Sequence, residues 1–185
     1  MADGRGLLPA FTEDGVLPPG DYPLTLEGLA ASTLVGSPDA LSGWDATWRA
    51  ELVGNLGILV HQLGRVGIEA VYIDGSVEDK AHPHDIDGYF DCDLGYLESG
   101  ALERDLNALD PHKAWTWHHQ QRRWDPDSGK AQLPMWFAYH VELYPHFGQP
   151  AGITDRFGNQ LQFPSAFRLS RRSNIPKGIV RIVRP

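Results

Sequence analysis

Residues 74–93 have the sequence DGSVEDKAHPHDIDGYFDCD, which contains seven carboxylates, a Gly-Ser pair and two histidines. The stretch follows the apolar run AVYI at residues 70–73, so a strand-forming segment leads directly into it. It is either a solvated acidic loop or a segment that holds metal ions. The spacing of its polar residues helps to distinguish the two.

Two of the carboxylates, Asp85 and Asp87, belong to a predicted strand with the sequence DIDGYFD. Side chains alternate along a strand, so both project from one face, about 6.5–7 Å apart, while Ile86 and Phe90 face the core. Neighbouring carboxylates repel each other unless a cation lies between them. Oxygen-rich sites of this kind suit Mg²⁺, which shares its ligands with substrate phosphates.

The Gly-Ser pair lies at the end of the preceding apolar run. Gly75 allows the backbone to approach a ligand closely, and the Ser76 hydroxyl with neighbouring N–H groups can hold phosphate oxygens. Lys80 follows in the connecting loop, where it either contacts a triphosphate or balances the local acids. A strand, a Gly-Ser turn, a loop and an Asp-x-Asp strand together indicate a metal-nucleotide site.

This arrangement, with eight residues between Gly-Ser and Asp-Ile-Asp, resembles the signature of the DNA polymerase β-like nucleotidyltransferase superfamily. The likeness is greatest to small stand-alone bacterial nucleotidyltransferase-like proteins, and it covers roughly residues 68–145. It implies that Gly75 and Ser76 hold the triphosphate and that Asp85 and Asp87 bind two Mg²⁺ ions. A later strand supplies the third carboxylate in that family, which here implies Glu142 within HVELY, a Glu in place of the commoner Asp.

The resemblance implies a Mg²⁺-dependent enzyme that transfers a nucleoside monophosphate from an NTP, with ATP expected, to a hydroxyl of RNA, protein or a small molecule. Stand-alone members often act in toxin–antitoxin or phage-defence systems. The alternative is a catalytically silent nucleotidyltransferase-like module that binds nucleotide, RNA or a partner protein, because folds are reused for unrelated tasks. A third hypothesis, a histidine-using metal hydrolase, rests on His82, His84, His118 and His119, but these offer few zinc ligands of fixed geometry.

The length and the order of helical and strand patterns predict one α+β domain over residues 1–185. The resemblance implies that this domain has a nucleotidyltransferase-like fold, a small mixed sheet flanked by helices. Residues 1–24 form a turn-rich lead-in. Residues 156–185 carry seven basic residues and no acid, although the net charge of the chain is −8. With a single cysteine, Cys92, and no apolar leader or spanning run, we expect a cytoplasmic protein without a membrane partner. The oligomeric state stays open.

Outside the acidic stretch, the spacing of apolar residues predicts a helix over 44–64 and helical structure over 96–110 that Gly100 interrupts. Strands are expected over 134–147 and near the end, in GIVRIVRP. Turns are expected in DPDSGK and DRFGNQ, at residues 125–130 and 155–160.

The segment WTWHHQQRRW, residues 115–124, interleaves aromatic and basic residues. It is either an RNA-contacting surface or an ordinary, partly buried hairpin or helix. Five basic residues are candidates for substrate contacts, two within this segment and three near the C-terminus: Arg122, Arg123, Arg171, Arg172 and Lys177.

Overall fold

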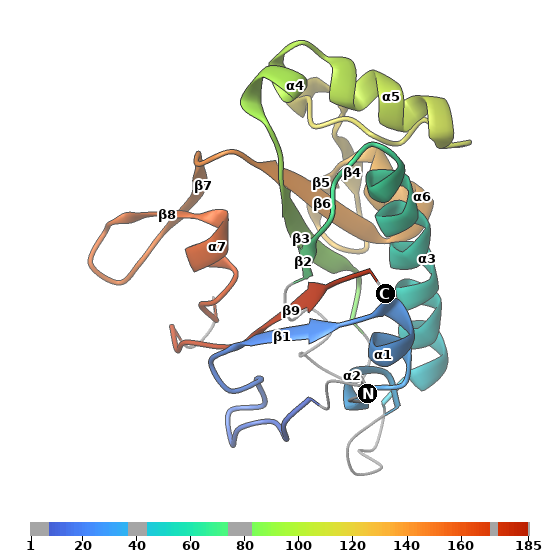
Figure 1. Ribbon diagram of the computed structural model, residues 1–185. Coiled ribbons are helices and arrows are strands. Elements are labelled where there is room, and N and C mark those ends of the chain that lie inside the picture. Colours follow the sequence, from blue (N-terminus) through green and yellow to red (C-terminus); the bar gives the residue numbers. More distant parts are fainter. Residues whose placement is uncertain (1–7, 37–43, 74–82, 171–173, 185) are drawn as a thin grey trace.

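The computed structural model describes residues 8–36, 44–73, 83–170 and 174–184 (Figure 1). Its strands are β1 (Asp21–Leu24), β2 (Val71–Ile73), β3 (Ile86–Asp91), β4 (Arg123–Asp125), β5 (Lys130–Gln132), β6 (Val141–His146), β7 (Pro150–Thr154), β8 (Gln160–Gln162) and β9 (Ile179–Ile182). Its helices are α1 (Leu26–Ala30), α2 (Thr33–Gly36), α3 (Ala46–Arg65), α4 (Leu94–Glu98), α5 (Ala101–Leu109), α6 (Pro134–Tyr139) and α7 (Phe163–Ala166), with a 3₁₀ turn at His119–Gln121.

The central sheet has the strand order β1-β9-β2-β3-β6. Its outer pairs, β1 with β9 and β3 with β6, are parallel, whereas β9 with β2 and β2 with β3 are antiparallel. Two short hairpins, β4–β5 and β7–β8, lie outside this sheet. A mixed sheet with helices is the α+β architecture that the sequence predicts.

The strand β1 lies within residues 1–24, where the sequence indicates only turns. It pairs in parallel with β9, from Asp21 opposite Ile179 to Leu24 opposite Ile182. The pairing therefore joins two segments about 150 residues apart along the chain, and local turn signals carry no information about it. The predicted C-terminal strand is confirmed as β9.

The predicted helix over 44–64 is confirmed as α3. The Asp45 carboxylate caps the helix by accepting a hydrogen bond of 2.9 Å from the backbone N–H of Trp48. Leu56 and Leu59 of this helix are fully buried in the main hydrophobic core. In the described part of the chain, no helix combines the length and the apolarity needed to cross a membrane.

The helical region over 96–110 is also confirmed, with the interruption at Gly100. Gly100 has a φ of 68°, a left-handed conformation that glycine adopts readily, and it separates α4 from α5. The two predicted turns are confirmed as the β4–β5 and β7–β8 connections. In each turn an aspartate accepts backbone N–H groups: Asp125 from Ser128, and Asp155 from Phe157 and Asn159.

The prediction of one strand over 134–147 is wrong in its first half. Residues 134–139 form α6, with Pro134 in its first turn, and His140 ends the helix in a left-handed conformation with a φ of 51°. The strand β6 begins only at Val141. Pro at the start of a helix costs no hydrogen bond because the first N–H groups have no partner within the helix, and this signal outweighs the β-forming aromatic residues.

The two faces of the sheet carry different layers. The helices α1, α2, α3, α5 and α6 contribute to the large core on one face, and in Figure 1 the column of α3 and α6 stands beside the sheet. On the other side, β7, β8 and α7 form an arm, which contributes Ala166 and Phe167 to a small cluster with Tyr89 and Ile179.

Candidate functional site

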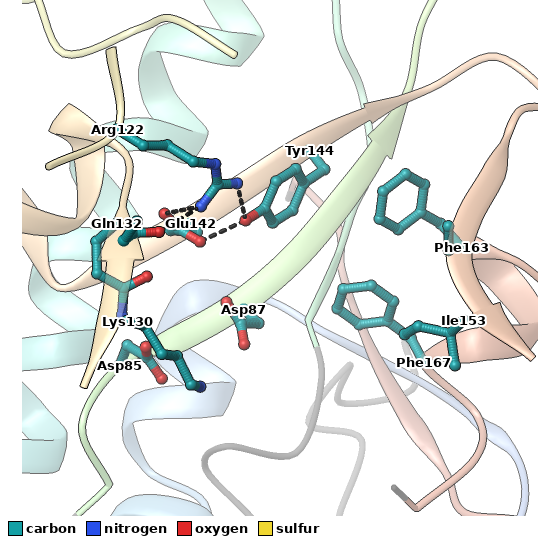
Figure 2. A pocket seen from close by; sticks show the side chains of 12 residues that line it. Asp85, Asp87, Arg122, Lys130, Gln132, Glu142, Tyr144, Ile153, Phe163 and Phe167 are labelled. Atoms are coloured by element: carbon teal, nitrogen blue, oxygen red, sulfur yellow. Dashed lines mark hydrogen bonds and ion pairs between the residues drawn. The ribbon is translucent and has the colours of Figure 1, made fainter. Parts of the chain in front are cut away.

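The adjacent strands β3 and β6 bring the predicted carboxylates to one cavity. They run in parallel, and Asp87 lies directly opposite Glu142 in their register. Asp85 precedes β3 by one residue and projects, with Asp87, away from the buried Ile86. The cavity has a volume of about 320 Å³ and all three carboxylates line it (Figure 2).

The cavity has a charged half and an apolar half (Figure 2). Five charged residues contribute to the first half: Asp85, Asp87, Arg122, Lys130 and Glu142. Four apolar residues from the C-terminal arm and the segment after it contribute to the second: Ala151, Ile153, Phe163 and Phe167. Tyr144 lies between them, with its ring stacked on that of Phe163 at 5.6 Å between centroids and its hydroxyl directed to the charged half.

Glu142 is buried, with 4% of its surface exposed, and both of its oxygens accept hydrogen bonds. Oε1 accepts from the backbone N–H of Leu133 at 2.7 Å, and Oε2 accepts from the Tyr144 hydroxyl. The Arg122 guanidinium lies 3.9 Å from Oε1. A buried carboxylate needs such donors, because an unpaired buried charge is strongly unfavourable.

Tyr144 links Glu142 to Arg122. Burial raises the pKa of the Tyr144 hydroxyl, and the negative charges of Glu142 and Asp87 raise it further. The hydroxyl therefore keeps its proton near neutral pH, donates it to Glu142 and accepts an N–H of Arg122 at 3.2 Å. These contacts fix the orientation of all three side chains.

Arg122 is also held by the β4–β5 hairpin, since its Nη1 donates to the carbonyl oxygen of Ala131 at 2.8 Å. Burial alone would lower the pKa of this guanidinium, but the hydrogen bond with Tyr144 and the charges of Glu142 and Asp87 outweigh it, and the pKa is raised. The cavity therefore contains a permanent cation beside its acids.

The carboxylate of Asp85 is oriented by α6. Its Oδ2 accepts a hydrogen bond of 2.8 Å from the indole N–H of Trp136, which is itself buried. The helix α6, which lies between β5 and β6 in the chain, thus brings a buried hydrogen-bond donor to Asp85. Asp87 lies opposite Glu142, and its charge acts on both Arg122 and Tyr144.

The donor set suits a hard divalent cation. Asp85, Asp87 and Glu142 offer only oxygen atoms, and Mg²⁺ is usually held by one or two carboxylates together with waters and substrate phosphates. Among residues 8–36, 44–73, 83–170 and 174–184, no three His, Cys, Asp or Glu side chains are grouped closely enough to hold a metal ion by themselves. The acidic pair with a substrate phosphate matches the usual Mg²⁺ arrangement, and zinc coordination would need more protein ligands.

Several predicted site residues lie outside the described residues: Gly75, Ser76, Lys80, Arg171 and Arg172. Of the other predicted substrate contacts, Arg122 lines the cavity, whereas Arg123 and Lys177 do not. Arg123 is exposed with its guanidinium 4.3 Å from the ring centroid of Phe137, and Lys177 is buried elsewhere.

The remaining acids of the opening stretch have separate positions. Asp91 is exposed at the end of β3, and Asp93 caps α4 by accepting the backbone N–H of Tyr96 at 2.9 Å. Neither lines the cavity. In the aromatic segment 115–124, Trp115 is fully buried and its indole donates to Gln62, as expected for an ordinary packed segment.

Sequence reasoning did not identify Tyr144, Lys130, Phe163 and Phe167 as cavity residues. Tyr144 has a readable signal, because it is two residues after Glu142 on the same strand face. Lys130 follows the DPDSG turn, so the hairpin returns it to the cavity. Phe163 and Phe167 have no comparable signal, since only the fold of the arm brings them near β3 and β6.

The structure thus defines an α+β protein with an acidic, partly aromatic cavity beside β3 and β6 of its mixed sheet. The chain belongs to the family described as "Family of unknown function (DUF6932)", whose family model matches residues 9–183. Searches of curated proteins and of solved structures found no match.

Proposed function

We propose that the protein is a Mg²⁺-dependent nucleotidyltransferase that transfers a nucleoside monophosphate from an NTP to a hydroxyl of RNA, protein or a small molecule. The proposal joins the sequence resemblance to one structural observation. Asp85 and Asp87 come from one segment and Glu142 from another about 50 residues later, yet all three line one cavity, with Asp87 directly opposite Glu142.

The topology around the acids supports the proposal. The strand β2, which leads into Gly75 and Ser76, pairs with β3, and β3 pairs with β6. A phosphate clasp at the end of β2 would therefore begin beside the strand that carries Asp87. The resemblance implies the same order of the Gly-Ser pair, the Asp-x-Asp pair and the third carboxylate along the chain, and here β2, β3 and β6 follow in that order.

In this proposal Asp85 and Asp87 hold the metal, and Glu142 is the third carboxylate. Each carboxylate oxygen has two lone pairs, so the bond that each Glu142 oxygen accepts leaves it one further lone pair. A bound Mg²⁺ would supply charge stabilisation at the phosphates and lower the pKa of the acceptor hydroxyl. Trp136 orients Asp85, and the apolar half of the cavity excludes water from the nucleoside.

The test is incubation with α-labelled NTPs, Mg²⁺ and either total RNA or a cell lysate. We expect the label to appear on a macromolecule with the wild type and with Asp91→Asn, and not with Asp87→Asn. Asp91 is the matched control because it is a carboxylate on the same strand that does not line the cavity. Label transfer that persists in Asp87→Asn would contradict the proposal.

A second candidate is a catalytically silent module that binds nucleotide, RNA or a partner protein. The observation in its favour is that both oxygens of Glu142 are already hydrogen-bonded, so the carboxylate is committed to holding Arg122 and Tyr144. Calorimetric titration with Mg²⁺-NTP distinguishes the two functions. Binding that Asp87→Asn abolishes, without label transfer to any acceptor, would favour the module.

A further inference from the structure

The cavity contains one guanidinium that is held in place from three directions. Arg122 donates to the Ala131 carbonyl at 2.8 Å and to the Tyr144 hydroxyl at 3.2 Å, and it lies 3.9 Å from Glu142 Oε1 (Figure 2). Only 24% of its side chain is exposed. A long, flexible side chain loses considerable rotamer entropy on being fixed in this way, so the arrangement needs three supporting partners.

The supports are themselves anchored. Glu142 accepts the backbone N–H of Leu133, and Tyr144 stacks on Phe163. A guanidinium has five N–H donors in a planar fork, and the two hydrogen bonds of Arg122 account for two of them. Because the remaining part of the fork belongs to a cavity-lining side chain, it can present donors to a ligand there.

The charges of the cavity restrict the ligand. The three carboxylates that line the cavity would repel a simple anion. Its two basic residues, Arg122 and Lys130, would weaken the binding of a simple cation without preventing it, since the acids outnumber them. A ligand that carries both an anionic group and a chelated divalent cation satisfies both sets. A planar fork of donors matches phosphate oxygens, and Mg²⁺ shares its ligands between carboxylates and phosphates. A metal-chelated polyphosphate has this chemistry.

We infer that Arg122 binds a phosphate group of a metal-chelated polyphosphate in this cavity, and that Glu142 and Tyr144 are positioning residues that hold its guanidinium toward the ligand. The inference rests on the proposed function for the identity of the polyphosphate as that of an NTP. It assigns the anion-binding role to the β4–β5 hairpin, a segment outside the Gly-Ser and Asp-x-Asp motifs.

The neighbouring arginine provides a matched control. Arg123 is the next residue in the chain, the first of β4, and carries the same charge. It is exposed, packs over the Phe137 ring at 4.3 Å and does not line the cavity. Arg122→Met and Arg123→Met therefore change the net charge equally. Only the first removes donors from the cavity.

The experiment is calorimetric titration of the purified full chain with pyrophosphate and tripolyphosphate, with and without Mg²⁺. We expect Arg122→Met to weaken binding by about 10-fold or more, since hydrogen bonds to charged groups are among the strongest. Arg123→Met should stay within about 2-fold of the wild type. Arg122→Lys, which keeps the charge and loses the fork, should be intermediate. Circular dichroism and thermal unfolding confirm that each variant folds.

A second measurement separates positioning from mere structural support. Tyr144→Phe removes only the hydroxyl that links Arg122 to Glu142, and we expect about 3- to 10-fold weaker polyphosphate binding. In the double variant Arg122→Met/Tyr144→Phe the loss should be no greater than in Arg122→Met alone, because Tyr144 acts through Arg122. Additive losses would contradict the positioning role.

The results distinguish this inference from the proposed function. Polyphosphate binding that depends on Arg122, without label transfer from NTP, supports the inference while the transferase proposal fails. Label transfer with polyphosphate affinity unchanged in Arg122→Met overturns the inference alone. The inference is also overturned if the folded wild type shows no binding of polyphosphate at ligand concentrations up to about 10 mM, which is the range of very weak affinities. If Arg122→Met does not fold, the Arg122→Lys and Tyr144→Phe titrations decide.

Discussion

The strands β3 and β6 present two contrasting faces to the rest of the protein. Toward the helices their side chains are apolar and fully buried: Ile86, Phe90, Val141 and Leu143. Toward the cavity they carry Asp87, Glu142 and Tyr144. The same backbone therefore serves the core and the candidate site, because successive residues of a strand point to opposite sides. Substitutions one residue apart should consequently affect different properties.

The largest effect is expected on the cavity face, from Asp87→Asn. Removing one carboxylate charge should lower nucleotidyl transfer by about 10³-fold or more, since metal-based charge stabilisation is worth several kcal/mol and about 1.4 kcal/mol is tenfold. The melting temperature should change little, because the repulsion from Asp85 that is relieved opposes the attraction to Arg122 that is lost. Rate measurements and thermal unfolding on the same preparations check both parts. A large fall in stability would show that the two faces are not separable.

The converse substitution, Leu143→Ala, lies on the helix face between Glu142 and Tyr144. Leu143 is fully buried, and its truncation should cost about 2–5 kcal/mol of unfolding free energy through lost burial and the remaining cavity. Urea unfolding measures this cost. In the fraction of molecules that stays folded, the Mg²⁺ concentration needed for nucleotidyl transfer should match that of the wild type. A shift in the Mg²⁺ requirement would mean that the core sets the geometry of the acidic pair.

On the helix side of the sheet, most of the structure could be predicted from the sequence because its signals are local. The spacing of Leu56 and Leu59 gave α3, Gly100 gave the break between α4 and α5, and alternation gave the buried positions Ile86 and Phe90. Each of these features is decided within a few residues, because helix and strand periods act locally. The exception is α6, where aromatic residues favoured a strand and Pro134 in the first turn favoured the helix that forms.

The cavity face could be predicted only in part. Asp85 and Asp87 share a strand, so their common face was readable. The pairing of Asp87 with Glu142 was not readable from residue patterns, because register between strands about 50 residues apart depends on the whole sheet. Arg122 and Lys130 reach the cavity through the β4–β5 hairpin, and nothing in their local sequence separates Arg122 from Arg123.

One carboxylate breaks the rule that the helix side is apolar, and it provides a pH test. Asp110, at the end of α5, is fully buried and accepts hydrogen bonds from Tyr139, Gln62 and the backbone N–H groups of His112 and Ala114. Burial by itself would raise the pKa of Asp110, but these donors outweigh it and the pKa is lowered.

Because the folded pKa of Asp110 is depressed, its contribution to stability is present above its unfolded value, near 3.9, and is lost as the pH falls through the folded pKa. Asp110→Asn should cost about 1–3 kcal/mol at neutral pH, and the difference from the wild type should shrink below about pH 4. Urea unfolding at a series of pH values from about 2 to about 7 measures this trend, because the linkage acts over that range. Glu98→Gln, at the exposed end of α4, should change stability by less than about 0.5 kcal/mol at every pH. A pH-independent cost at Asp110 would contradict the assignment.

The smallest effect is expected from a substitution that distinguishes the apolar half of the cavity from the charged half. Phe163 lines the apolar half and stacks on Tyr144, while the polyphosphate contacts lie in the charged half. Phe163→Leu keeps apolar volume but loses the ring, so NTP binding should weaken by about 3- to 10-fold, the order of one aromatic stacking contact. Pyrophosphate, which has no base, should bind within about 2-fold of the wild type.

Calorimetric titration with both ligands checks the difference, and Phe157→Leu is the matched control because Phe157 is 75% exposed at the β7–β8 turn. Equal weakening of NTP and pyrophosphate by Phe163→Leu would mean that the ring acts only by holding Tyr144, and through it Arg122. Selective weakening of NTP would instead assign the C-terminal arm to the nucleoside and β3, β5 and β6 to the phosphates. The cavity would then bind the two chemical parts of one ligand with two separate segments of the chain.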